Sequence, residues 1–196
     1  ALPLHPRVAH MLVLAGPEAA PLAALIEARD PLRGAPCDLT LRLEALRDLG
    51  RFSRERPYQV LRPALEQIRA ETRRLRGRAK PAELPGLSAA AMAALAYPDR
   101  IGQRRKGDAP RYVLSGGKGA VMAPGDGLAS APFVVATDLD GDPREAKVRM
   151  AAQISEREIR ELFAHQIGWV DLCEWSKRER RVVARKQERF GAITLD

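Results

Sequence analysis

Cysteine and histidine are scarce in this sequence. The only cysteines, Cys37 and Cys173, are far apart, and neither has a partner at C-x-x-C spacing. Two reduced thiols in a core explain such a pair better than a disulfide or a metal site. His5 and His10 stand five residues apart, so a helix would not place both on one face, as a zinc-binding helix requires. We therefore expect this chain to hold no metal and no cofactor of its own.

Long apolar runs are also missing. No run approaches the roughly 18 apolar residues that a membrane-spanning helix needs, and the opening ALPLHPRVAH lacks the regions of a signal peptide. These absences predict a soluble, cytoplasmic protein without membrane contact. The chain begins abruptly and stops within a strand-like segment, so we expect it to be a fragment of a longer protein.

No catalytic motif is complete. The nearest approach to the phosphate-binding loop of nucleotide hydrolases is GGKG at 116–119, but glycine stands where that motif needs a hydroxyl, and strands flank it. Asp138, Asp140 and Asp142 have the spacing of the first ligands of a calcium loop. Pro143, however, takes the place of the glycine that such a loop requires. Tight turns account for both segments, and we predict no catalytic residue in this chain.

Acidic residues are outnumbered. Lys and Arg total 33 against 25 Asp and Glu, which gives a formal net charge of +8 and a pI near 10.1. An excess of this sign attracts polyanions, nucleic acid first among them. The alternative is that a GC-rich genome supplies arginine for reasons of composition. With 45% hydrophobic residues among 196, the chain can bury the core of one or two domains.

The first half of the chain has the apolar periodicity of helices. Asp30-Pro31 ends one helical segment, because proline disfavours the helical conformation in the residue before it, and Asp38 caps the next. The segment at 77–86, GRAKPAELPG, lacks periodicity and predicts a domain boundary. Helices are expected at residues 8–15, 18–29, 38–50, 62–76 and 88–96.

After Pro110 the apolar period changes to that of strands. The segment DLDGDPR at 138–144 is typical of a turn, and Ser155 with Glu158 forms an S-x-x-E capping box at the start of one further helix. Strands are expected at residues 111–115, 119–123, 133–137, 146–152, 169–175, 180–186 and 192–195.

These patterns predict an α+β fold in three parts. Residues 1–86 form a small N-terminal helical bundle, and residues 87–167 form a small β-barrel of the oligonucleotide-binding (OB) type with one inserted helix. Residues 168–196 begin a C-terminal extension, and completion of the barrel is their alternative role.

Basic residues gather at 97–121, where the helical and β halves meet; this segment is called the join below. Cations neutralise phosphates and aromatic faces stack on bases, so we predict nucleic-acid contact there. The residues expected to make it are Tyr97, Arg100, Arg104, Arg105, Arg111 and Lys118, with Lys106 and Tyr112 interleaved. In the alternative, Arg100 and Arg104 lock the two domains together by ion pairs. Asp99 and Glu83 would be their partners.

Two further segments are basic. The run at 177–189 is denser than the join, but Val182 and Ala184 alternate with its charges, as in an exposed barrel strand. The arginines of the helix at 62–76 either face RNA or form a solvated helix face, helped by intrahelical pairs such as Glu66 with Arg69.

Five segments spread over the chain carry a family resemblance. They are LHPRVAHML at 4–12, RDPL at 29–32, LEALR at 43–47, AYPDRIGQRR at 96–105 and RYVLS at 111–115. Together they resemble the accessory region of the HrpB family of bacterial DEAH-box ATP-dependent helicases. The segment at 96–105 is the most specific of the five.

The resemblance implies a parent protein whose two RecA-like domains hydrolyse ATP with magnesium and lie upstream of Ala1. It also implies that residues 1–86 are the helicase-associated, ratchet-like domain, that 87–167 are the OB-like domain, and that 168–196 begin the family's C-terminal extension. In related helicases the first two domains cap the motor core and help enclose single-stranded RNA, and the OB-like domain is also a docking site for partner proteins.

Two functions follow as hypotheses. In the first, the chain is the accessory, nucleic-acid-binding C-terminal fragment of an ATP-dependent RNA helicase. It holds single-stranded RNA, with DNA as an alternative, against the RecA-like domains of the same polypeptide. In the second, it is a protein-interaction or regulatory module that docks on the motor core or an acidic partner, as the apolar residues within 177–189 favour.

Overall fold

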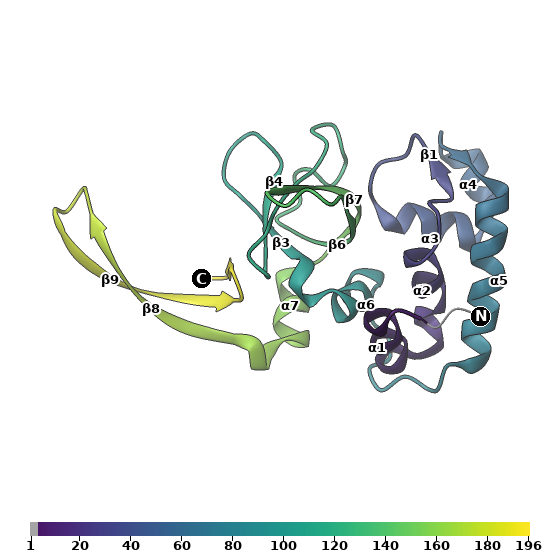
Figure 1. The fold of residues 1–196 in the computed structure, drawn as a ribbon, viewed down its shortest axis with the longest axis horizontal. Helices are drawn as coiled ribbons and strands as arrows, with labels where there is room; N and C mark the ends of the chain where they lie inside the picture. The colour runs from purple at the N-terminus through teal and green to yellow at the C-terminus, as the bar shows by residue number, and fades with distance from the viewer. Residues whose placement is uncertain (1–3) are drawn as a thin grey trace.

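The computed structural model describes residues 4–196. A helical bundle forms one end of the molecule, a small barrel lies in the middle, and a two-stranded β-ribbon extends away from the barrel (Figure 1). This arrangement confirms the expected α+β fold, with helices in the N-terminal half and an OB-like barrel after them.

The helical bundle occupies residues 6–78. Asp48 is extended, with a φ of −148°, so the single helix expected over 38–50 breaks there into two. The side chain of Asp48 then caps the second helix by accepting a hydrogen bond from the backbone N–H of Arg51. The elements are α1 (Pro6–Ala15), η1 (Gly16–Ala19), α2 (Ala20–Ile26), β1 (Leu32–Arg33), α3 (Leu39–Arg47), α4 (Leu49–Glu55), β2 (Gln59–Val60) and α5 (Arg62–Arg78).

The segment at 6–26, from α1 to α2, is long and apolar enough to cross a membrane by length and composition, with a mean hydropathy of 1.5. This corrects the expectation that no run approaches such a length. The segment is an interior element of the bundle: Met11, Leu22 and Leu25 are buried, α2 packs on α5, and α1 packs on a later helix, α6 (Ala89–Ala96). Its position in the core therefore explains its apolar character.

Five short strands close into the barrel in the order β3-β4-β5-β7-β6. All neighbours are antiparallel except β5 and β7, which are parallel, and β6 returns to pair with β3. Inside the barrel, the buried hydroxyl of Tyr112 lies 3.0 Å from the carbonyl oxygen of Leu128 and 2.9 Å from that of Ala131. The strands are β3 (Ile101–Arg104), β4 (Arg111–Leu114), β5 (Gly119–Val121), β6 (Phe133–Leu139) and β7 (Glu145–Gln153).

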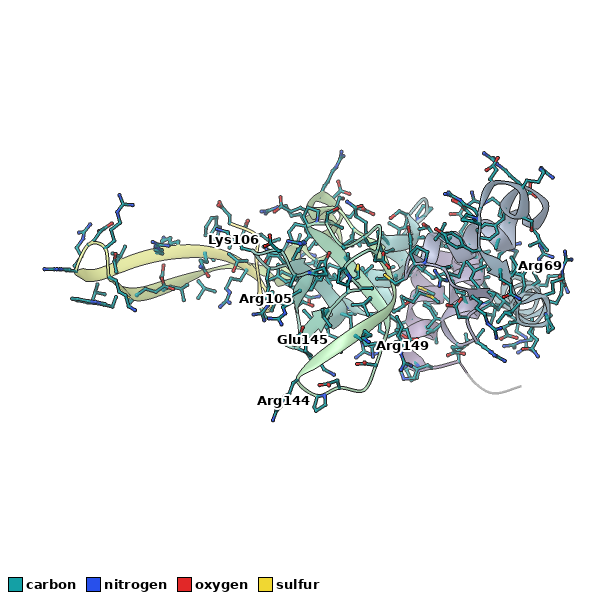
Figure 2. The ribbon with its side chains drawn as sticks, turned by 90° about the horizontal axis from the view of Figure 1, so that it is seen from above. Arg69, Arg105, Lys106, Arg144, Glu145 and Arg149 are labelled. Atoms are coloured by element: carbon teal, nitrogen blue, oxygen red, sulfur yellow. The ribbon has the colours of Figure 1, made fainter. Side chains whose placement is uncertain are left out.

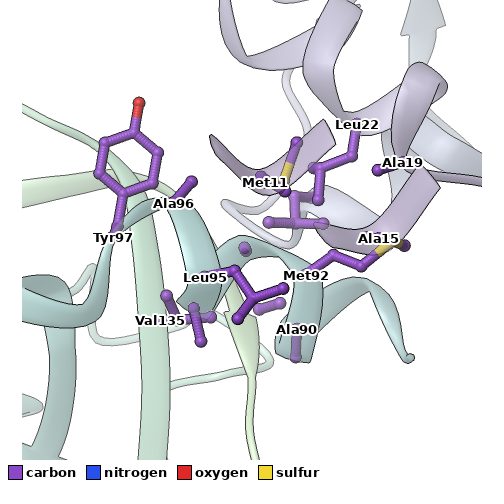
Figure 3. Close-up of a cluster of buried hydrophobic side chains, with 14 of the residues drawn as sticks. Met11, Ala15, Ala19, Leu22, Ala90, Met92, Leu95, Ala96, Tyr97 and Val135 are labelled. Atoms are coloured by element: carbon purple, nitrogen blue, oxygen red, sulfur yellow. The ribbon is translucent and has the colours of Figure 1, made fainter. Parts of the chain in front are cut away.

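Bundle and barrel share one hydrophobic core. Helix α6 (Ala89–Ala96) is buried along almost its whole length and packs on α1 from one side and on β6 and β7 from the other. Figure 3 shows Leu95 of this helix between Met11 of the bundle and Val135 of the barrel. The same cluster continues into α7 (Glu156–Leu162), so these parts pack as one body.

Helix α7 follows the last barrel strand instead of standing between two of them. Its predicted capping box is confirmed: the Ser155 hydroxyl accepts from the N–H of Glu158, and the Glu158 carboxylate accepts from the N–H of Ser155. The same carboxylate accepts a hydrogen bond from the hydroxyl of Ser88, the N-cap of α6. One glutamate therefore ties together the starts of two helices.

The last 30 residues form a separate three-stranded sheet, β10-β9-β8. The barrel closes without them, so completion of the barrel is not their role. At the base of this sheet the ring of Phe190 stacks on Phe163 at 5.0 Å, and Ile193 is buried. The strands are β8 (Ile167–Ser176), β9 (Arg181–Phe190) and β10 (Ile193–Thr194). Cys173 lies on β8 and is exposed, which corrects the expectation of a core thiol, whereas Cys37 is buried.

Candidate nucleic-acid interface

Tyr97, the first predicted contact residue, is a structural residue. It follows the last turn of α6 and is only 8% exposed. The guanidinium groups of Arg100 and Arg7 lie 4.7 Å and 5.5 Å from the centre of its ring. Burial raises the pKa of its hydroxyl. A ring held in this way does not offer a free face on which a base could stack.

Arg100 and Asp99 brace the join, although not with each other. Arg100 donates a hydrogen bond of 3.2 Å to the carbonyl of Thr137 on β6. Asp99 accepts two hydrogen bonds from Arg7 of α1, at 2.5 Å and 3.1 Å. Burial opposes ionisation of Asp99, yet the hydrogen bonds from Arg7 and the backbone lower its pKa overall. The brace is therefore real, but its ion pair uses Arg7 where Arg100 or Arg104 was expected.

Arg104 holds two loops of the barrel together. Its Nε donates to the carbonyl of Ala129 at 2.7 Å, and its Nη1 donates to that of Gly107 at 3.1 Å. The guanidinium thereby supplies donors that loop carbonyls would otherwise lack. This residue, like Tyr97 and Arg100, has a structural task.

The other predicted contact residues are exposed but do not form one patch. Arg105 and the neighbouring Lys106 lie in the β3–β4 loop, and the N–H of Arg105 bonds the carbonyl of Arg111 (Figure 2). Arg111 also forms an ion pair of 3.3 Å with Glu145. Lys118 belongs to the turn at the opposite end of β4. Arg105 and Arg111 are therefore neighbours, while Lys118 stands apart.

The turn segments behave as the sequence predicts. Gly117 has a φ of 98°, which a turn between β4 and β5 requires and which glycine adopts readily. The carboxylate of Asp140 accepts from the backbone N–H groups of Lys147 and Asp142, and these bonds lower its pKa. Among residues 4–196, no group of three or more His, Cys, Asp or Glu side chains has the arrangement of a metal site.

The structure contains a basic groove that was not predicted from the sequence. It lies among α2, α3, α5 and α6 and has a volume of about 620 Å³. Its apolar lining includes Leu22, Leu43, Leu46, Leu87 and Met92, and its cationic lining consists of Arg47, Arg69, Arg73 and Arg76. We call it the arginine groove. Within the described part of the chain, Arg69 pairs with Glu66 at 2.8 Å, and the other three arginines have no carboxylate at ion-pair distance.

The periodicity of α5 explains three of these arginines. Leu65, Ile68 and Leu75 are buried on one face of the helix. Arg69, Arg73 and Arg76 are spaced at i, i+4 and i+7, so they lie together beside that face. The sequence shows this stripe but not what it faces. Arg47 comes from α3, and only the packing of α3 against α5 brings it to the groove. Guanidinium groups around an apolar floor suit phosphates and the flat faces of bases.

Bundle, barrel and ribbon together resemble part of a helicase of known structure. No protein-family model and no curated protein matches this chain. Among solved structures, it is similar to the Escherichia coli DExH-box NTPase HrpB, with a TM-score of 0.70 and 27% identity over 98% of this chain and 22% of that one. A second structure, of the E. coli DEAH/RHA helicase HrpB, matches with a TM-score of 0.69 and 26% identity over the same shares.

These matches confirm the resemblance to HrpB that the sequence motifs indicated. The chain spans about a fifth of the length of the HrpB chains it matches, 22% in both.

Proposed function

We infer that this chain is the accessory, nucleic-acid-binding C-terminal part of an ATP-dependent RNA helicase. In the intact, cytoplasmic protein, two RecA-like domains of the same polypeptide would bind ATP and magnesium and supply movement. The similarity to HrpB over 98% of the chain supports this assignment.

The arginine groove is the observation that carries the nucleic-acid role. Arg47, Arg73 and Arg76 bring positive charge without a carboxylate partner among residues 4–196. The one carboxylate that lines the groove is Glu18, and Glu66 is paired with Arg69. The apolar floor accepts bases without reading their edges. Binding of single-stranded RNA should therefore be steeply salt-dependent and nearly independent of sequence.

A titration of this chain with fluorescent oligo-uridine at several salt concentrations tests the role of the groove. In the double variant Arg73→Glu and Arg76→Glu, affinity should fall, and the slope of log K against log salt should shrink by about 1.4, since each phosphate contact on a single strand contributes about 0.7. The matched control is Arg33→Glu with Arg54→Glu, which makes the same charge change at exposed positions of the bundle outside the groove. Equal losses in both double variants would reduce the effect to net charge.

The exposed residues of the join need a separate variant. Arg105→Glu with Lys118→Glu removes two predicted contacts that the fold does not use, and we expect a smaller loss of affinity than in the groove variant. A competing oligo-deoxyuridine shows whether DNA binds equally well. If neither double variant weakens oligo-uridine binding, the RNA role of both surfaces is wrong.

The alternative function, a protein-interaction or regulatory module, is favoured by a different observation. The β-ribbon exposes large apolar side chains far from the groove, including Trp169, Trp175 and Val182.

A further inference from the structure

The β-ribbon formed by β8 and β9 has a tryptophan-rich face. Its strands pair without interruption from Ile167 with Phe190 to Ser176 with Arg181, and directly paired residues point to the same side. One face therefore carries the pairs Trp169–Glu188, Asp171–Lys186, Cys173–Ala184 and Trp175–Val182. We call it the tryptophan face. Trp169 is 60% exposed, and Trp175 and Val182 are each 63% exposed.

The opposite face of the ribbon is partly apolar as well. Val170, Leu172 and Val183 project there, beside Arg185 and Arg181. The ribbon packs on the rest of the molecule at its base, through Phe190 and the short strand β10, and its outer part extends into solvent (Figure 1). A two-stranded ribbon is marginally stable in water by itself, so apolar residues on both of its sides indicate a covering surface.

Charge decides what kind of surface fits. On the tryptophan face Glu188 lies directly across from Trp169, and Asp171 follows two residues later, with Lys186 as the one cation on that face. Glu188 is ion-paired with Arg160 of α7 at 2.6 Å, and Asp171 lies directly opposite Lys186, so this face has no excess of positive charge to hold the phosphates of a nucleic acid stacked on the tryptophans. The tryptophan face therefore suits a protein surface better than RNA.

The tip of the ribbon has the opposite charge. Lys177, Arg178, Arg180 and Arg181 surround a single carboxylate, Glu179, which is held by Arg181. Next to this tip Trp175, Val182, Cys173 and Ala184 form a continuous apolar patch. The complementary surface is thus an apolar hollow bordered by acidic residues.

We propose that the β-ribbon is an arm that docks on the RecA-like motor domains of its own polypeptide, with Trp175 and Val182 in an apolar hollow and the basic tip against carboxylates. The inference rests on the proposed function, which supplies those domains. In HrpB the matching region is 22% of the chain, so most of that polypeptide is available to cover such an arm. A tethered surface acts at a high effective concentration, so weak contacts suffice.

Binding of this chain to the separately purified upstream part of its polypeptide, measured by calorimetry, tests the arm. Trp175→Ser with Val182→Ser should weaken binding by at least about 30-fold, as loss of a central aromatic anchor does. Lys177→Glu with Arg178→Glu should also weaken binding, and more so at low salt. The control is Val13→Ser, which removes an equally exposed valine from α1, 60% exposed, and should change affinity less than twofold.

Three results would overturn the proposal. The first is equal affinity of the ribbon variants and the unaltered chain. The second is self-association of the chain, seen by sedimentation, that the Trp175 and Val182 changes abolish, since a second copy would then be the occupant. The third is a loss of oligo-uridine affinity in these variants, which would assign the ribbon to RNA.

Failure of the proposed function has its own signature. If the upstream coding sequence lacks a phosphate-binding loop and a D-E-A-H-type box, the helicase assignment itself is wrong, and the arm has no such surface to meet. If the upstream part hydrolyses ATP and RNA stimulates it, but the ribbon variants bind normally, only the docking arm is wrong.

Discussion

The ion pair between Arg7 and Asp99 joins residues that are 92 positions apart in the chain. It fixes α1 to the short turn that leads into β3, beside the buried ring of Tyr97. The guanidinium of Arg7 is already hydrogen-bonded to Asp99, so its charge stabilises the fold and is not free to bind a ligand. The charge of the join is accordingly a weaker sign of nucleic-acid contact than its density in the sequence indicates.

The substitution Asp99→Asn should destabilise the protein in a pH-dependent way. The pKa of Asp99 is lower in the folded state, so its stabilising effect is complete above the unfolded value of about 3.9 and disappears as pH falls through the folded value. Since the pair is partly exposed, we expect a loss of about 0.5–1 kcal/mol at pH 7. Urea unfolding at pH 7 and pH 3 measures it, and an equal loss at both values would contradict the assignment.

Among the elements, β10 holds the ribbon to the barrel through a tight turn. Gly191 has a φ of 54°, and a Cβ atom there would lie 2.2 Å from the carbonyl oxygen of Ser115. The same carbonyl accepts the N–H of Ala192 at 2.8 Å, and Gln103 bonds the backbone of Thr194. This close approach requires glycine.

Gly191→Ala should therefore detach β10 or lower the stability by more than about 1 kcal/mol, because the added methyl meets backbone and the left-handed conformation disfavours alanine. Gly168→Ala, at the same end of the ribbon, is the control: its Cβ would meet nothing within 4 Å, and its φ is not positive. Thermal unfolding of the two variants compares them directly. Equal melting temperatures would show that the turn can shift at no cost.

Element by element, local signals were readable in the sequence and long-range contacts were not. The capping box of Ser155 and Glu158 depends on residues three positions apart, and it forms as predicted. Strand β3 was not expected, because in IGQR only Ile101 is apolar and its pairing with β4 and β6 is long-range. The arginine groove was missed for the same reason, since Arg47 joins the stripe of α5 through tertiary packing.

At the scale of the whole molecule, bundle and barrel are joined by more than α6. The carbonyl of Cys37, just before α3, accepts from the N–H of Ala151 on β7, and the N–H of Cys37 donates to Asp126 of a barrel loop. Burial, together with Asp126, raises the pKa of the Cys37 thiol well above its usual range. The boundary predicted from composition at 77–86 thus separates the helical bundle from the barrel in sequence, but the two parts share one hydrophobic core.

We therefore expect residues 4–166 to unfold as one cooperative unit. Calorimetry should give equal calorimetric and van't Hoff enthalpies for the main transition. A chain truncated after residue 86 should be unfolded, because α6, which covers α1, is then lost. Two separate thermal transitions, or a folded fragment 1–86, would contradict a shared core.

The ribbon also carries both tryptophans of the chain, Trp169 and Trp175. The intrinsic tryptophan fluorescence of this protein therefore reports on the ribbon alone. It does not report on binding or unfolding in the bundle or the barrel. Emission excited at the indole band will shift toward blue when the arm is covered, without any label. Denaturation followed by tryptophan emission therefore reports on the ribbon and not on the helices or the barrel.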